Sequence, residues 1–203
     1  MTKVVHESDA RTARSRSQLK SALLELLGEK PFSQIRTKEI AGRARIHRVT
    51  FYDHYAAKED LLEELIDDVL TEYADIIEST PSNLIAQWPP MLLVKTIRQS
   101  IRHIGKHAEF YRILLLTNGV PDLTNRLHDQ MSRSLHVSLG RMSTKHADID
   151  YDLFIDWIIG GAIAIYKHWL QSGMKQTEED IAKQMLRITL AAGQVFNPRR
   201  VIL

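Results

Sequence analysis

Few side chains in this sequence have the types and spacing that chemistry requires. His103 and His107 lie four positions apart, so a single helix would bring both imidazoles to one face, where they could bind a metal ion. Gly105 lies between them and predicts a helix break, and the nearest carboxylate, Glu109, has no special spacing. Because no HExxH motif is present either, we expect no metal site, and we expect the two histidines at a helix end or in the wall of a pocket.

Side chains that carry covalent catalysis are absent or lack their usual setting. The chain has no cysteine, which excludes a thiolate nucleophile and a disulfide framework. Serine and histidine occur, but no serine stands in a G-x-S-x-G turn, and no glycine-rich loop could cradle a phosphate group. We therefore expect no enzyme and no cofactor, and we keep a small all-α enzyme or metalloprotein as the alternative.

Basic side chains gather at the N-terminal end of the chain. Net charge is only +2 over 203 residues, but residues 1–58 hold 12 Lys and Arg against 6 Asp and Glu, whereas residues 59–203 hold 15 against 19. A basic end on an acidic body is typical of a protein whose one end meets phosphates. No apolar run marks a signal peptide, and the most apolar stretch, Phe154–Tyr166, is too short to span a bilayer. We expect a cytoplasmic protein that binds no membrane.

The basic end contains a stretch, residues 35–58, that predicts two short helices joined by a tight turn. Thr37 is suited to cap the first helix, Arg45 stands where the chain should turn, and His47 begins the second helix. Apolar residues follow helical spacing at Ile40, Ala41, Ala44, Val49, Phe51, Tyr52 and Tyr55. Two helices that meet steeply across a short turn form a helix-turn-helix, whose second helix fits the DNA major groove.

The rest of the chain also predicts helices, and no strand pattern of useful length is present. A leucine stripe at residues 19, 23, 26 and 27 marks a helix before the motif, and another helix runs from Lys58 to about Glu78. Further helices are predicted at 91–105, 107–117, 122–142, 150–172 and 177–194. The fold class is therefore all-α, with an N-terminal three-helix domain at residues 1–58 and a helical domain at residues 59–203.

The helix-turn-helix stretch resembles the DNA-binding segment of the TetR family of transcriptional regulators. The residues that carry the resemblance are Thr37, Ile40, Ala41, Ala44, Ile46, Thr50, Phe51, Tyr52, Tyr55, Lys58, Glu59, Leu61 and Leu62. Two positions depart from the family pattern, because Arg45 replaces the usual glycine of the turn and His47 replaces the usual serine. A second run, residues 154–182, is similar to the last two helices of a TetR subgroup, which pair with a second subunit.

The resemblance implies which residues meet DNA. Arg48, Val49 and Thr50 would reach base edges from the start of the recognition helix. Lys38 would reach the backbone or a base, and the remaining members would contact phosphates. The expected set is Lys38, His47, Arg48, Val49, Thr50, Tyr52, His54 and Lys58.

The resemblance also implies a repressor that binds a palindromic operator as a homodimer and is released by a small-molecule effector. An activator, or a regulator that a partner protein controls, is the alternative. We expect an effector pocket near His107, Phe110, Tyr111, Leu114, Gln130, Trp157 and Ile158. Gly160 and Gly161 weaken an apolar helix unless another helix approaches closely, which suggests a dimer interface. The expected interface residues are Gly160, Gly161, Ala164, Ile181, Met185 and Ile188.

Overall fold

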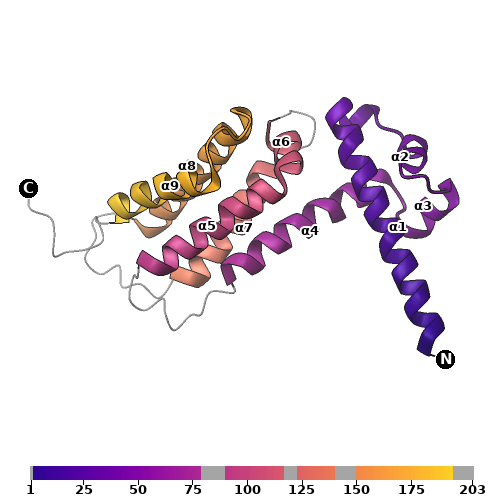
Figure 1. Ribbon diagram of the computed structural model, residues 1–203, viewed down its shortest axis with the longest axis horizontal. Helices are drawn as coiled ribbons and strands as arrows, with labels where there is room; N and C mark the ends of the chain where they lie inside the picture. Colours follow the sequence, from indigo (N-terminus) through magenta and orange to yellow (C-terminus); the bar gives the residue numbers. More distant parts are fainter. Residues whose placement is uncertain (1, 79–89, 117–122, 140–149, 194–203) are drawn as a thin grey trace, which may run out of the picture. The chain divides into compact units, whose positions relative to one another are not determined.

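The computed structural model describes residues 2–78, 90–116, 123–139 and 150–193, and these residues form helices and short connections without a strand (Figure 1). The all-α prediction is confirmed. The helices are α1 (Thr2–Glu29), α2 (Thr37–Arg43), α3 (Arg48–His54), α4 (Lys58–Glu78), α5 (Pro90–Lys106), α6 (Ala108–Leu116), α7 (Leu123–Leu139), α8 (Tyr151–Gln171) and α9 (Glu178–Gly193), with a 3-10 turn η1 (Phe32–Gln34).

The chain divides into two compact units, and the division falls inside α4, after Val69. We call residues up to Val69 the head and the helical residues from Leu70 onward the body. The boundary expected from the sequence lies at residue 58. The head extends further because the first turns of α4 supply part of its core, including the fully buried Leu61.

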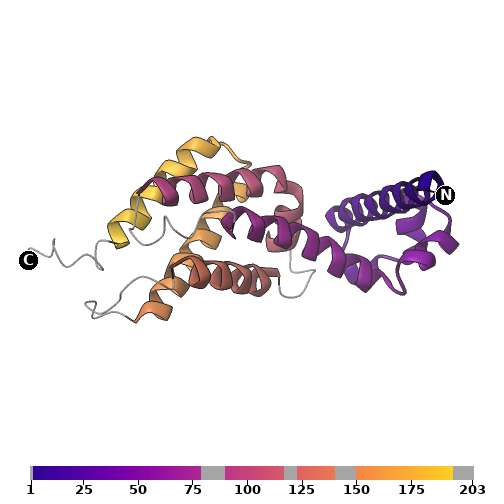
Figure 2. The ribbon, with the colours of Figure 1, turned by 90° about the horizontal axis from the view of Figure 1, so that it is seen from below.

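The head is built around the apolar faces of α1 to α4. The predicted leucine stripe is buried on α1, where Leu19 and Leu23 are inaccessible to solvent. Ile40 of α2 and Phe51 of α3 are equally buried, and Figure 2 shows α1 lying beside these two short helices. The periodicity of apolar residues therefore determines which face of each head helix turns inward.

Ion pairs join α1 to the start of α4 along one side of the head. Arg16 and Lys20 of α1 both pair with Glu64, whose Oε1 also accepts a hydrogen bond of 3.1 Å from the Tyr55 hydroxyl. Burial raises the pKa of the Glu64 carboxyl, but hydrogen bonds from Arg16 and Lys20 outweigh that effect and hold the pKa below its usual value. The network ties α4 to the head.

The body packs α5 against α9, and α8 against α6 and α7 (Figures 1 and 2). α8 buries Ile155, Ile159 and Tyr166 along one face. The predicted end of α8 is confirmed, because Gly173 has φ 72° and the Met174 N–H bonds Trp169 O at 3.0 Å. The Thr177 side chain caps α9, since its Oγ1 accepts from Asp180 N at 3.1 Å.

One expectation about the body helices is wrong. α5 runs through Gly105 to Lys106, so the break lies at His107, and the Gly105 Cα faces Trp169 and the Glu178 side chain. α8 has 21 residues, and its segment Asp152–Gln171 is long and apolar enough to cross a membrane by length and composition alone, with mean hydropathy 1.2. Core helices also meet these criteria of length and composition, and α8 packs its buried face against α6 and α7 in the body.

Candidate nucleic-acid interface

The turn between α2 and α3 has the left-handed geometry that its position suggested. Arg45 has φ 55°, its N–H bonds Gly42 O at 3.1 Å, and the Ile46 N–H bonds Ala41 O at 2.9 Å. This pair of hydrogen bonds is the Schellman ending of an α-helix, in which the left-handed position is usually glycine. An arginine therefore occupies the one strained position of the motif, with its side chain exposed to solvent.

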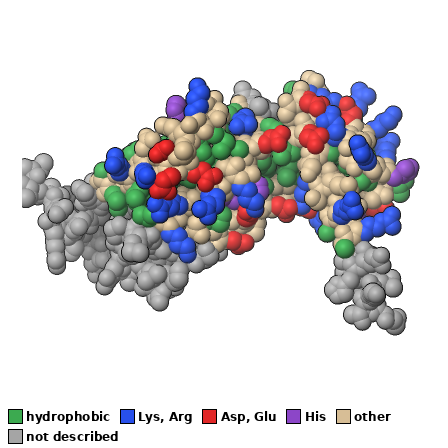
Figure 3. Space-filling model, in the orientation of Figure 1, with side chains coloured by type: hydrophobic (Ala, Val, Ile, Leu, Met, Phe, Trp, Pro, Cys, Tyr) green, Lys and Arg blue, Asp and Glu red, His purple; other side chains and the backbone are tan. Residues whose placement is uncertain are grey.

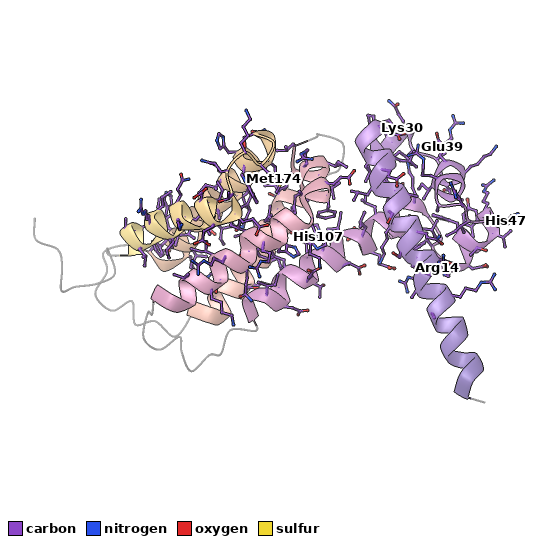
Figure 4. All side chains as sticks on the ribbon, in the orientation of Figure 1. Arg14, Lys30, Glu39, His47, His107 and Met174 are labelled. Carbon is purple, nitrogen blue, oxygen red and sulfur yellow. The ribbon has the colours of Figure 1, made fainter. Side chains whose placement is uncertain are left out.

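The two short helices are capped by Arg36 and His47, and the first of these differs from the Thr37 that the sequence indicated. Arg36, not Thr37, is the N-cap of α2, and Glu39 Oε2 accepts from the Arg36 N–H at 2.9 Å. Lys30 pairs with the same carboxylate at 2.5 Å (Figure 4). His47 precedes α3 as its N-cap, and its Nδ1 accepts from the Val49 N–H at 3.3 Å. The imidazole thus replaces the serine hydroxyl that the pattern would place there.

The outer face of α3 carries the side chains expected to read bases. Val49 is 61% exposed and Arg48 is exposed beside it, while Phe51 on the opposite face is fully buried. Arg48 Nη2 donates to the Tyr52 hydroxyl at 3.1 Å, and this hydrogen bond lowers the pKa of Tyr52. The Arg48 guanidinium also lies 5.4 Å from the centre of the Tyr52 ring, so the two side chains hold each other in place.

The other expected contacts lie around this face with one exception. Lys38 is exposed on α2, Thr50 and His54 are half-buried on α3, and Figure 4 shows His47 at the outer surface of the head. Lys and Arg side chains cover much of that surface (Figure 3).

Lys58 is the exception and corrects the expected set. Its ammonium donates to Phe32 O at 2.7 Å and to Ile35 O at 2.8 Å, and it lies 4.4 Å from the centre of the Phe32 ring. Two of its three N–H bonds therefore satisfy carbonyls of the turn between α1 and α2, and the side chain holds that turn rather than a phosphate. No local sequence signal distinguishes these uses, because a lysine side chain reaches either kind of oxygen.

The body contains a mostly apolar cavity of about 120 Å³. Of the expected pocket residues, Trp157 and Ile158 line it. The others do not, because Phe110, Tyr111 and Leu114 are buried core residues, His107 bonds Glu72, and Gln130 Oε1 accepts from Arg133 at 2.7 Å. The sequence analysis did not identify three hydroxyl groups in the wall of this cavity. The Tyr73 hydroxyl lies 3.4 Å from Ser100 Oγ and 3.5 Å from the Tyr166 hydroxyl.

The expected interface residues also separate into two groups. Gly160, Gly161, Ala164 and Ile188 are exposed, and a Cβ added at either glycine would meet no atom within 4 Å. Ile181 and Met185 are buried within the chain itself, which contradicts their assignment to an interface. The phase of α9 explains the error, because the stripe on which these two residues lie faces α5.

The fold and the exposed face of α3 together define a helix-turn-helix DNA-binding protein. Comparison with known proteins agrees. Residues 19–65 match the family model described as bacterial regulatory proteins of the tetR family, and residues 93–190 match the one described as a transcriptional regulator C-terminal region. The chain belongs to the TetR family of transcriptional regulators, whose members are regulators rather than enzymes.

Individual relatives are similar at lower coverage or lower identity. An uncharacterised HTH-type regulator of Bacillus subtilis (strain 168), YxbF, is 40% identical over 77 residues, which are 36% of this chain and 20% of that protein. A TetR regulator from Streptococcus agalactiae 2603V is 23% identical, with a TM-score of 0.67 over 91% of this chain and 98% of that chain. NalD of Pseudomonas aeruginosa, the secondary repressor of the MexAB-OprM efflux pump, is 16% identical, with a TM-score of 0.68 over 89% and 97%. The similarity to these two solved structures shows that the chain shares their fold.

Proposed function

We propose that this regulator is a repressor that binds a palindromic operator as a homodimer in the cytoplasm and leaves it when an effector enters the body. The observation that carries the proposal is the outer face of α3, where Arg48 and Val49 are exposed at the end of the helix that enters the groove. Arg48 suits the O6 and N7 atoms of guanine, and Val49 suits a thymine methyl group. Lys38, His47, Tyr52 and His54 supply phosphate contacts that position the helix.

Dimerisation is proposed from the exposed apolar face of α8 and α9. Trp157 is 56% exposed and Ile188 is 51% exposed, which is unusual for side chains of this size. Gly160 and Gly161 cost about 1 kcal/mol each relative to alanine inside a helix, and a Cβ added at either would meet no atom of the described part of the chain within 4 Å. Trp157, Gly161 and Ile188 also line the cavity of the body, so the proposed interface adjoins it. A second copy of α8 and α9 would cover this face as a four-helix bundle about a two-fold axis.

The cavity of the body is the proposed effector site. Its volume of about 120 Å³ is close to the ~150 Å³ of an apolar cavity that accepts benzene. We therefore expect a small, mainly apolar effector that bonds the hydroxyls of Tyr73, Ser100 or Tyr166. Such a ligand weakens operator binding only by the difference between its affinities for the DNA-bound and free forms.

An activator is the second candidate, because DhaS, a protein of known structure with a similar fold, is an activator of the dihydroxyacetone kinase operon. DhaS is 17% identical, with a TM-score of 0.59 over 87% of this chain and 94% of that chain. In vitro transcription from the bound promoter separates the two, since a repressor lowers and an activator raises the amount of transcript.

Operator recognition is tested by fluorescence anisotropy with DNA that flanks the protein's own gene. Arg48→Ala should reduce the preference for one base pair in each half-site by about 1–3 kcal/mol, because it removes a base contact. Arg102→Ala removes an exposed arginine of the body and serves as the matched control. Unchanged base preference in Arg48→Ala would contradict the assignment of Arg48 to base reading.

A further inference from the structure

A cluster of three metal-binding side chain types lies in the body beside the cavity wall, since the His103 ring centre is 5.4 Å from that of Tyr73. Glu72 comes from α4 and His103 from α5, and His107, which Figure 4 labels, follows the last residue of α5. One ligand atom from each of the three side chains lies within 4.8 Å of the other two. Glu72 Oε2 is 2.9 Å from His107 Nε2, and Glu72 Oε1 is 3.6 Å from His103 Nδ1.

His103 is the member that an ordinary ion-pair network leaves unexplained. Its side chain is 0% exposed, and its Nδ1 has no hydrogen-bond partner although the atom is buried. A buried polar atom without a partner is rare and costly. The other ring nitrogen, Nε2, lies 3.1 Å from the hydroxyl of the buried Tyr111. Nδ1 therefore faces the carboxylate with its lone pair free whenever Nε2 carries the hydrogen and donates it to Tyr111.

We propose that Glu72, His103 and His107 bind a divalent first-row transition metal ion of the Zn²⁺ class. Zn²⁺ takes imidazole nitrogen and carboxylate oxygen at about 2.0–2.2 Å, which places tetrahedral ligand atoms roughly 3.3–3.5 Å apart. The separations from Glu72 Oε1 to His103 and from Glu72 Oε2 to His107 lie on either side of that value.

The surroundings of the cluster fit a bound ion. The Tyr111 hydroxyl orients His103 in the way that a hydrogen-bond partner orients a metal-ligating imidazole. Glu72 and His107 are partly exposed and provide a path for the ion, while the fourth position stays open for water.

Lys106 competes with the ion for the same carboxylate. Its Nζ lies 2.7 Å from Glu72 Oε1 and its side chain is 61% exposed. In the absence of metal, this ammonium neutralises Glu72, and a bound cation would displace it. The competition distinguishes a metal site from a plain ion-pair network, because a metal site predicts tighter Zn²⁺ binding when Lys106 is removed, whereas an ion-pair network predicts no stoichiometric Zn²⁺ binding with or without Lys106.

The test uses the full chain, stripped with a chelator and titrated with Zn²⁺ and with Co²⁺, whose absorption reports tetrahedral coordination. We expect one equivalent bound per chain, with affinity lowered more than about 10-fold by His107→Gln or Glu72→Gln, and about 10–100-fold by Tyr111→Phe. His168→Gln removes an exposed histidine and should leave binding unchanged. Lys106→Ala should bind Zn²⁺ more tightly than the natural protein, and because Lys106 is exposed this variant also keeps the test informative if the others fold poorly.

Two results would overturn the proposal. One is the absence of stoichiometric Zn²⁺ binding at micromolar concentration in both the natural protein and Lys106→Ala. The other is equal binding by the natural protein and by folded His107→Gln, which would place the ion on surface histidines. The proposal does not depend on operator binding, so either result leaves the proposed repressor function intact.

Discussion

Replacing Arg45 by glycine should stabilise this protein, although the arginine stands in its most specific motif. Arg45 has φ 55° at the left-handed position of the Schellman ending of α2, where its Cβ crowds the following carbonyl. Relieving that conformation is worth about 1–2 kcal/mol for an L-residue. Glycine gives back about 0.5–1 kcal/mol, because it gains more freedom in the unfolded chain.

The difference predicts a net stabilisation of up to about 1.5 kcal/mol for Arg45→Gly. For a chain of 150–250 residues, 1 kcal/mol moves the midpoint of thermal unfolding by about 2–4 °C, so a rise of up to roughly 6 °C is expected. Circular dichroism at 222 nm measures it directly, since the described residues are helical.

Arg45→Ala is the matched control, because it removes the same charge but keeps a Cβ at the left-handed position. It should not raise the unfolding midpoint. A midpoint for Arg45→Gly that is equal to or below that of Arg45→Ala would refute the account of strain in this turn. If the charge of Arg45 attracts phosphate, the two variants should lose DNA affinity equally, which separates the electrostatic effect from the conformational one.

Three further perturbations test other parts of the structure. Lys58→Ala should lower the free energy of unfolding by about 1.5–3 kcal/mol, because two carbonyls lose a charged donor. The dependence of DNA binding on salt concentration should stay the same. A slope of log affinity against log salt concentration that is reduced by about 1 would instead show that Lys58 contacts a phosphate. If the exposed face of α8 and α9 buries well over ~1,000 Å² in a dimer, Ile188→Asp should sediment as a monomer and lose operator binding. Sedimentation of the natural protein as a monomer at micromolar concentration would exclude that dimer. The pKa of Glu64 is lower in the folded than in the unfolded chain, so Glu64 stabilises the head at neutral pH, and this contribution is lost as the pH falls through the folded pKa. Glu64→Gln should therefore make the free energy of unfolding fall less steeply in acid. An unaltered acid profile would show that Glu64 does not cause the loss of stability.

The helix-turn-helix could be predicted from the sequence because its signals are local. Ile40 and Phe51 are spaced to turn inward on short helices, and the turn between them has room for only one left-handed residue. The exposed Arg48 and Val49 follow from that phase without further information. A short motif in which each position has one steric role leaves few alternatives.

The errors occur where a side chain chooses between partners from different helices. Lys58 finds carbonyls 23 and 26 positions away, and Glu72 meets His107 across 35 positions, and neither spacing has a sequence signature. In the body, the packing of α9 on α5 turned Met185 inward, whereas Ile188 three positions later stayed exposed. Such rotations of a helix about its axis are decided by packing, which the order of apolar residues limits but does not determine.

The position of the division inside α4 also bears on how proteins of this kind can be recombined. Leu61, Leu65 and Glu64 of α4 belong to the head, and the matched family region continues to residue 65. A gene fusion that joined this head to the body of another protein at residue 58 would remove the part of α4 that completes the core of the head. The compact unit ends at Val69, so we expect a workable crossover point in the middle of α4 rather than in a loop.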